Sequence, residues 1–303
     1  MRGFVGVTDR EWYEFLRGQP HLDEVNFWQP SGRNRFRAVP AGSPFFFKLH
    51  APHNAIAGYG IFARHEIVPD WLAWEAFGIA NGAPDHETMR RRIRKYRKLG
   101  EGSAQESFNV GCLMITEPVF FPQGEWIEQP RDWKPNIVSG KGYSLAEGEG
   151  LRIWEECKAR RGLALAETGP RFGGPQLIQP RLGQGSFKIA VTAAYEGACA
   201  VTREHSLPVL EAAHILPYAK GGEHRTANGL LLRTDIHRLY DRHYVSVTPD
   251  LTFKVGERLR SEWHNGRTYY ELEGRPVVLP ESNADHPDRE LLSQHYEEFL
   301  AAG

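Results

Sequence analysis

Two histidines and an asparagine in one short stretch of the chain have the types and spacing needed to hydrolyse a phosphodiester. They are His214, Asn228 and His237. An imidazole can take a proton from water near neutral pH, because its unperturbed pKa is about 6.5. The pattern favours His214 as this general base.

A strand, a turn, a second strand and a short helix must position these side chains. We predict strands at 210–215 and 229–232 and a helix at 235–241, with Gly221 and Gly222 marking the turn. Because this unit folds back on itself within a short length of chain, it can bring the three side chains to one phosphate.

The same reaction needs positive charge near the phosphoryl oxygens and the leaving 3′ oxygen, which a divalent cation supplies. His237 is the first candidate ligand. Asp241 follows on the same helical face, with Cβ atoms about 5–6 Å apart, and either completes the metal site or orients His237. Asn228 is expected to hold the loop through its amide. His224 in the loop and His243 after the helix are expected to be exposed.

The amino-acid sequence of this stretch resembles the HNH endonuclease family, and in particular its restriction-endonuclease-like branch. The segments that carry the resemblance are Ala-Ala-His-Ile, Gly-Gly, Asn-Gly-Leu-Leu-Leu and His-x-Leu-Tyr-Asp, and it covers about residues 181–250. It implies a ββα-metal finger with His214 as the base, Asn228 as the middle Asn and His237 as the last motif residue. The implied cofactor is a divalent metal ion, Mg²⁺ or Mn²⁺ first, with other transition metals as further options.

One position departs from the family pattern. Many members carry an Asp or His metal ligand directly before the base, whereas this chain has Ala213 there. Glu211 on the same strand is therefore a candidate ligand beside His237 and Asp241. The departure also favours an alternative in which the domain binds nucleic acid without cutting it.

An aromatic segment rich in Arg and Asn, residues 26–37, precedes strand-like runs at 44–49 and 55–62. This order resembles the EVE branch of the PUA-like superfamily, which implies a domain that accepts a modified base in an aromatic pocket. Stacking a base on Trp or Tyr is worth about 1–3 kcal/mol. The expected pocket residues are Trp28, Ser31, Asn34, Tyr59, Trp74 and Trp126.

Residues 89–98 predict a strongly basic helix. Met89, Ile93 and Tyr96 recur at helical spacing and form one apolar stripe, which leaves basic residues on the rest of the surface. That surface is either solvated or follows the phosphates of DNA. The candidate backbone contacts are Arg90, Arg91, Arg94, Lys95, Arg97 and Lys98.

Length and composition indicate a folded α+β protein of two domains, at about 150 residues each. A hydrophobic fraction of 41% and a charged fraction of 25% exclude disorder and coiled coils. We predict a PUA-like β-barrel domain at 1–145, a helical connector and linker at 146–185 and an HNH nuclease domain at 186–303. The net charge is −1, so any attraction to DNA must come from local patches.

Further elements complete this prediction. Strands are expected at 25–28 and 110–116, a helix at 185–196 and a strand pair formed by 252–255 and 268–272, before a C-terminal helix at 289–300. Cys112, Cys157 and Cys199 are too far apart for a disulfide framework or a zinc knuckle, so we expect them to be reduced and buried.

The sequence contains no apolar run of the roughly 18 residues needed to cross a bilayer, and its first residues turn polar too early for a signal peptide. The expected address is cytoplasmic, with no membrane partner.

A domain that recognises modified bases, joined to a nuclease domain, is the organisation of a modification-dependent restriction enzyme. The expected substrate is double-stranded DNA, carrying modified cytosine. The expected assembly is a homodimer, since one ββα site cuts one strand. Two alternatives stay open: a catalytically inactive nucleic-acid-binding protein, and a nuclease whose first domain binds a protein or small-molecule partner.

Overall fold

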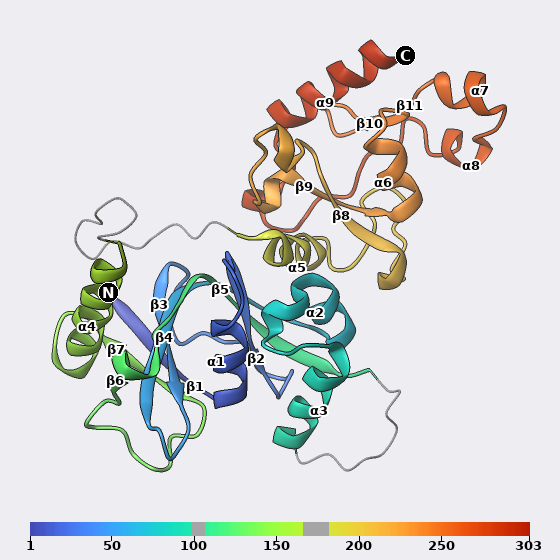
Figure 1. The fold of residues 1–303 in the computed structure, drawn as a ribbon. Helices are drawn as coiled ribbons and strands as arrows, with labels where there is room; N and C mark the ends of the chain where they lie inside the picture. Colours follow the sequence, from blue (N-terminus) through green and yellow to red (C-terminus); the bar gives the residue numbers. More distant parts are fainter. Residues whose placement is uncertain (98–106, 166–181) are drawn as a thin grey trace. The chain divides into compact units, whose positions relative to one another are not determined.

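The computed structural model describes residues 1–97, 107–165 and 182–303, which form two compact units, Met1–Ser186 and Phe187–Gly303 (Figure 1). Both units mix helices and strands, so the α+β class predicted from the sequence is confirmed. Each unit is described by itself below.

The first unit is built on one seven-stranded mixed sheet with the order β2-β5-β4-β3-β1-β7, and β6 pairs with β4 off this path. Its central strands are buried over the whole of β3, over residues 55–63 of β4 and over residues 110–116 of β5, and these parts form hydrophobic runs in the sequence. The strands are β1 (Arg2–Thr8), β2 (Glu24–Gln29), β3 (Ser43–Leu49), β4 (Ala55–Pro69), β5 (Asn109–Phe120), β6 (Ile127–Glu128) and β7 (Gly140–Ser144).

This sheet is not closed into the predicted barrel. Its path runs from β2 to β7, and these two strands do not pair with each other within the described residues. The 3-10 helix η1 (Gly78–Asn81) lies against β2 instead: the Asn26 amide donates to Asn81 Oδ1 at 2.8 Å and the Trp28 indole to the Asn81 carbonyl at 3.0 Å. Asn26 and Trp28 are two residues apart on the strand, so both side chains extend from the same face of β2, and η1 packs on that face.

Helix α4 (Gly148–Leu165) belongs to the core of the first unit, although the sequence assigned it to a connector at 146–185. Its Ile153, Trp154 and Cys157 pack in one cluster with Phe46 and Tyr59, and the helix lies beside β6 and β7 (Figure 1). The apolar face of this helix covers the sheet, so the chain up to Leu165 is part of the first fold. The remaining helices of this unit are α1 (Arg10–Arg17), α2 (Asp70–Phe77) and α3 (His86–Arg97).

The predicted basic helix is α3. Met89 and Ile93 are fully buried, as the apolar stripe requires, but Tyr96 is 43% exposed. The third stripe position lies past the part of the helix that the core covers.

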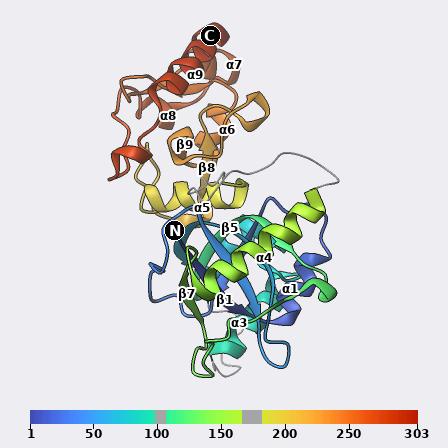
Figure 2. The ribbon, with the colours of Figure 1, turned by 90° about the vertical axis from the view of Figure 1, so that its left-hand side faces the viewer.

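The second unit surrounds a short antiparallel hairpin, β8 (Leu210–His214) and β9 (Gly229–Arg233), followed by α6 (Thr234–Tyr240). Figure 2 shows this unit in yellow to red, and its C-terminal helix α9 (Arg289–Ala302) contacts β10 (Val245–Val247). The hairpin, α5 (Gln184–Ala194) and α9 share one apolar core that includes Phe187, Leu231 and Leu292. The other elements are α5 (Gln184–Ala194), β10 (Val245–Val247), β11 (Phe253–Val255), α7 (Arg258–Trp263), α8 (Arg267–Tyr270) and α9 (Arg289–Ala302).

The strand predicted at 268–272 is wrong. Strand β11 pairs with β10, and residues 267–270 form helix α8. Gly266 adopts a φ of 111°, which turns the chain into this helix, and the Tyr269 hydroxyl then donates to Asp235 at 3.1 Å. The residue types at 267–270 favour a strand, but this segment forms a helical turn in which Tyr269 makes a long-range contact with Asp235.

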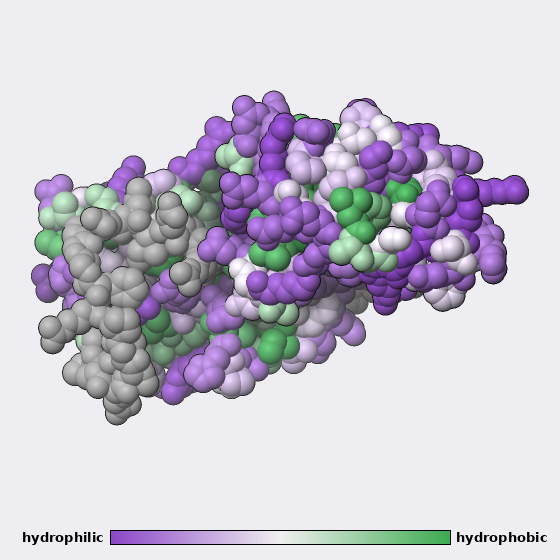
Figure 3. Space-filling model, turned by 90° about the horizontal axis from the view of Figure 1, so that it is seen from above, coloured by the Kyte–Doolittle hydropathy of each residue, from purple (hydrophilic) through white to green (hydrophobic). Residues whose placement is uncertain are grey.

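On the face in Figure 3, hydrophilic residues surround small separate hydrophobic patches. The three cysteines are buried and unbridged, as predicted. Within the described ranges, no helix is long and apolar enough to cross a bilayer.

Candidate active site

The hairpin and α6 bring the three predicted motif residues into one ββα unit. In the antiparallel register His214 pairs with Gly229, so Asn228 lies next to the end of the strand that carries His214. The Ile215 amide donates to the Asn228 carbonyl at 2.9 Å, which continues this pairing by one residue. His237 then follows on α6, which packs on both strands.

The Asn228 side chain holds the loop after His214. It is fully buried, accepts from the Leu216 amide at 2.8 Å and donates to the carbonyls of Leu216 at 3.0 Å and Glu223 at 2.9 Å. Gly222 makes this approach possible, because a Cβ there would lie 1.9 Å from the Leu216 carbonyl oxygen. The loop-holding function that the sequence suggests for Asn228 agrees with these contacts.

Replacing Asn228 by alanine is expected to destabilise the second unit by about 1–3 kcal/mol, because three backbone groups of the loop lose their side-chain partner at once. Asn228→Asp keeps the acceptor for the Leu216 amide and loses both donors, so we expect an intermediate loss. Urea unfolding of the three proteins measures the order. Equal stability of Asn228→Ala and wild type would show that water replaces the amide at no cost.

His214 lies half-buried beneath an aromatic ring. The Phe187 ring stacks on it with centroids 3.9 Å apart and an angle of 13° between the planes. Burial, and then the neighbouring His224 and His237, lower the pKa of His214 to about 4. The imidazole is therefore neutral at pH 7 and carries a free lone pair, as a general base requires.

His237 lies between two carboxylates. Glu211 Oε2 is 2.7 Å from His237 Nδ1, and Asp241 Oδ2 is 3.4 Å from Nε2. Burial lowers the pKa of His237, but hydrogen bonds and charge from Asp241 and Glu211 outweigh it and raise the pKa above its usual value. Each ring nitrogen thus has its own acidic partner.

This donor set fits a divalent cation at one side of the ring. His237 Nε2 and Asp241 Oδ2 lie 3.4 Å apart, close enough for both to contact one divalent cation. Glu211 lies at the opposite nitrogen, where a carboxylate orients a ligating histidine. No group of three or more His, Cys, Asp or Glu side chains in the described part of the chain is arranged to hold a metal ion. Only two protein ligands would therefore hold such an ion.

The structure also brings in residues that sequence reasoning missed. His224, expected to be exposed, places Nδ1 3.0 Å from His214 Nε2, and its ring stacks on Tyr218. Phe187 reaches His214 from α5. In the sequence, the signal that could have placed His224 near His214 was its position two residues after Gly222. His243, by contrast, pairs with Glu298 at 3.3 Å.

The basic helix α3 uses much of its charge within the fold. Arg90, Arg94 and Arg97 lie 4.7–5.9 Å from the ring centre of Phe108, and Arg90 is 3.1 Å from the buried Asp70 carboxylate. These three side chains are therefore engaged in the first unit, where the sequence suggested contacts with phosphates.

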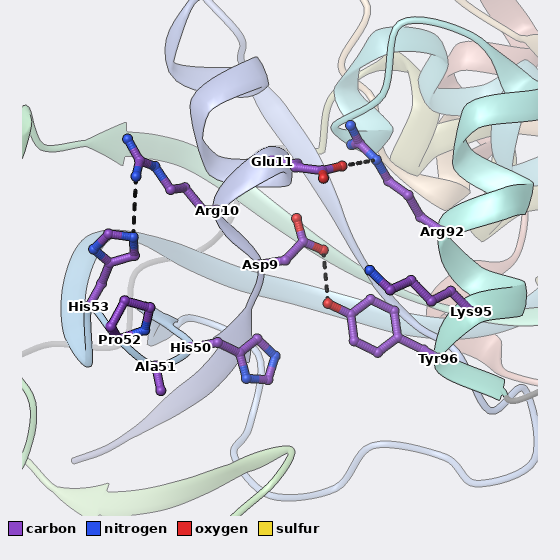
Figure 4. A pocket seen from close by; sticks show the side chains of 10 residues that line it. All are labelled: Asp9, Arg10, Glu11, His50, Ala51, Pro52, His53, Arg92, Lys95 and Tyr96. Carbon is purple, nitrogen blue, oxygen red and sulfur yellow. Dashed lines mark hydrogen bonds and ion pairs between the residues drawn. The ribbon is translucent and has the colours of Figure 1, made fainter.

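The other residues of this segment that were predicted to contact phosphates have different surroundings from these three arginines. Arg91 donates to Thr88 at 3.2 Å on the exposed side. Lys95 lines a cavity of about 420 Å³ together with Tyr96, whose hydroxyl donates to Asp9 at 3.3 Å (Figure 4). Lys98 lies outside the described residues.

A larger cavity of about 750 Å³ lies beside the aromatic segment of the first unit. Trp28, Ser31 and Asn34 line it, so three of the six predicted pocket residues surround one hollow. Tyr96 lies next to Trp28, with ring centroids 5.9 Å apart, and lines both cavities. The volume is typical of sites for small organic groups.

Tyr59, Trp74 and Trp126 do not line this cavity. Tyr59 is buried in the core because β4 is covered on both faces, and Trp74 stacks on His86 with ring centroids 5.9 Å apart. Trp126 donates to the Tyr13 hydroxyl at 3.0 Å. Aromatic residue type alone does not separate these packing positions from cavity walls.

Comparison with known proteins supports the assignment of the second unit. The family model for HNH endonucleases matches residues 199–248, which contain His214, Asn228 and His237. No curated protein matches the chain.

Similar solved structures resemble the chain only distantly. The crystal structure of ASCH from Zymomonas mobilis is 12% identical, covers 50% of this chain and 94% of its own, and has a TM-score of 0.34. The modification-dependent TagI restriction endonuclease is 13% identical, covers 97% of this chain and 81% of its own, and scores 0.28. The phosphorothioation-dependent restriction endonuclease ScoMcrA is 12% identical, covers 98% of this chain and 53% of its own, and scores 0.22.

HNH endonucleases generally use a divalent metal ion, which agrees with the donor set around His237. The chain therefore carries an HNH endonuclease domain at residues 199–248, and as an enzyme it is a nuclease.

Proposed function

We propose that this protein is a metal-dependent DNA endonuclease that hydrolyses phosphodiester bonds in double-stranded DNA carrying modified cytosine. The observation that carries the nuclease part is the ββα unit, in which a neutral His214 lies beside a loop held by Asn228 and near His237. The cavity lined by Trp28 supports the part that concerns base recognition.

In the proposed reaction His214 takes a proton from a water molecule as the water oxygen attacks phosphorus. The phosphorus–oxygen bond to the leaving 3′ oxygen breaks, and that oxygen takes a proton from solvent. The stack on Phe187 and the contact with His224 hold the His214 ring in place during proton transfer. Asn228 keeps the strand end and loop in this geometry.

His237 and Asp241 would hold the cation, and Glu211 would orient His237 through Nδ1. A divalent cation bound there supplies charge neutralisation for the phosphoryl oxygens and the leaving oxygen. Mg²⁺ suits such a site, because it retains several waters and takes few protein ligands, and Mn²⁺ is the second candidate.

The first unit acts as the reader in this proposal. A base turned out of the duplex would enter the larger cavity and stack on Trp28 or Tyr96, with Ser31 and Asn34 offering hydrogen-bonding groups. Lys95 and Arg91 would contribute salt-dependent contacts with phosphates that do not depend on the base.

The testing experiment incubates the full chain with matched duplexes, unmodified or carrying modified cytosine, in Mg²⁺ or Mn²⁺. We expect cleavage of the modified duplex. Equal cleavage of both duplexes would contradict the recognition of modified bases by the first unit and favour a protein or small-molecule partner for it. Binding without cleavage in either metal would favour the inactive binding protein.

Trp28→Ala is expected to lower the preference for modified over unmodified DNA by about 5- to 150-fold, the equivalent of one lost base stack. Because Trp28 is buried, Tyr96→Ala serves as a second variant at an exposed wall of the cavity. Trp263→Ala, a 63% exposed tryptophan in the second unit, is the matched control. Fluorescence anisotropy with both duplexes gives the ratio, and an unchanged ratio in both cavity variants would speak against this pocket.

The enzyme acts as a homodimer on DNA in this proposal, because one site cuts one strand and symmetric dimers are the commonest oligomers. Sedimentation of the complex measures this directly. A strict 1:1 species that still makes concerted double-strand breaks would overturn the dimer.

A further inference from the structure

The loop histidine His224 contacts the proposed base directly. Its Nδ1 lies 3.0 Å from His214 Nε2, and the two ring centroids are 5.1 Å apart. Both residues are on the same ββα unit, one at the end of β8 and the other in the loop that Asn228 holds. The contact is therefore part of the site rather than an accidental surface pair.

The hydrogen bond between the two imidazoles decides which nitrogen of a neutral His214 carries the proton. One nitrogen must donate and the other must accept, and each neutral ring carries a single N–H. If His214 Nε2 accepted, the proton of that ring would be on Nδ1, and neither nitrogen could take a proton from water. If Nε2 donates to His224, Nδ1 keeps a free lone pair.

Aromatic neighbours restrict both rings, so the pair has little freedom to rotate away. Phe187 stacks on His214 at 3.9 Å, and Tyr218 stacks on His224 at 4.5 Å with only 6° between the planes. These stacks keep the two nitrogens facing each other.

We propose that His224 is a positioning residue that accepts the Nε2–H of His214 and so selects the tautomer whose Nδ1 takes the proton from water. This inference rests on the proposed function, because it assumes that His214 is the base. It resembles in logic the partners that fix the tautomer of other working histidines, whose loss costs about 10- to 100-fold in activity.

The test uses two variants that separate the hydrogen bond from the packing. His224→Phe keeps an aromatic ring against Tyr218 but has no acceptor, whereas Asn in His224→Asn can place Oδ1 where Nδ1 was. We expect His224→Phe to cleave DNA about 10- to 100-fold more slowly. We expect His224→Asn to remain within a few fold of wild type, with thermal stability and DNA binding unchanged in both.

A second readout does not depend on activity. In the full chain with ¹⁵N-labelled histidine, the ring nitrogen shifts of His214, assigned by their loss in His214→Ala, report its tautomer. We expect the Nε2–H form in wild type and His224→Asn, and a mixture of tautomers in His224→Phe. Wild-type cleavage by His224→Phe, or the same His214 tautomer in all three proteins, would overturn the inference.

The two proposals fail in different ways. Cleavage by His214→Ala at the wild-type rate would remove the base, and with it the proposed reaction, whatever the spectra of His224 variants show. Loss of cleavage in His214→Ala with full activity in His224→Phe would leave the base intact and reject only the role of His224.

Discussion

DNA cleavage by His214→Ala is expected to fall by at least about 10²- to 10⁴-fold, because the proposed reaction then has no group to take the proton from water. Folding and DNA binding should stay close to wild type, since His214 lies at the end of β8 and is not one of its fully buried core residues. Single-turnover cleavage of a labelled duplex measures the loss.

His205→Ala provides the matched control, because His205 is exposed within the same HNH segment. It should cleave at the wild-type rate. Wild-type cleavage by both variants would mean that another group acts as the base. The pKa of about 4 also predicts that His214 stays neutral down to about pH 5, so its protonation does not limit activity near neutral pH.

Loss of the metal site is expected to abolish cleavage. Addition of EDTA to the wild type should stop the reaction, and His237→Ala and Asp241→Ala should each greatly weaken Mn²⁺ binding, because each removes one of two proposed protein ligands. Glu211→Gln should lower the cleavage rate by only about 10- to 100-fold, since the amide oxygen can still accept from His237 Nδ1. Calorimetric titration with Mn²⁺ and single-turnover cleavage give the order of the variants.

The same site predicts the direction of the pH effect. A proton and a cation compete for His237 Nε2, and the pKa of this imidazole is raised above its usual value. Metal affinity should therefore weaken as the pH falls through this raised pKa, while His214 remains neutral. Full cleavage in excess EDTA, or Mn²⁺ affinity that is the same in His237→Ala and wild type, would contradict the assignment.

The ββα unit could be predicted because its signals are local. The residue that ends β8, the Gly-Gly turn, the Asn before β9 and the helix with His237 all lie in one short segment of chain. Hydrogen bonds between neighbours in sequence form this unit, so residue types at fixed spacing were enough to locate His214, Asn228 and His237. Strands β2 to β5 and helix α3 of the first unit followed from local hydrophobic patterns for the same reason, whereas β1, β6 and β7 were not predicted.

Only the tertiary structure decided which side chains meet. Phe187 stacks on His214 from α5, and the geometry of the loop brings His224 to the same ring. The side of His237 on which Glu211 lies depends on the packing of α6 against β8. Such contacts join elements distant in the chain, and their geometry is set by how whole elements pack. By itself, the sequence therefore determined the motif and predicted its chemistry, whereas packing determined which side chains surround the motif residues and shift their pKa values.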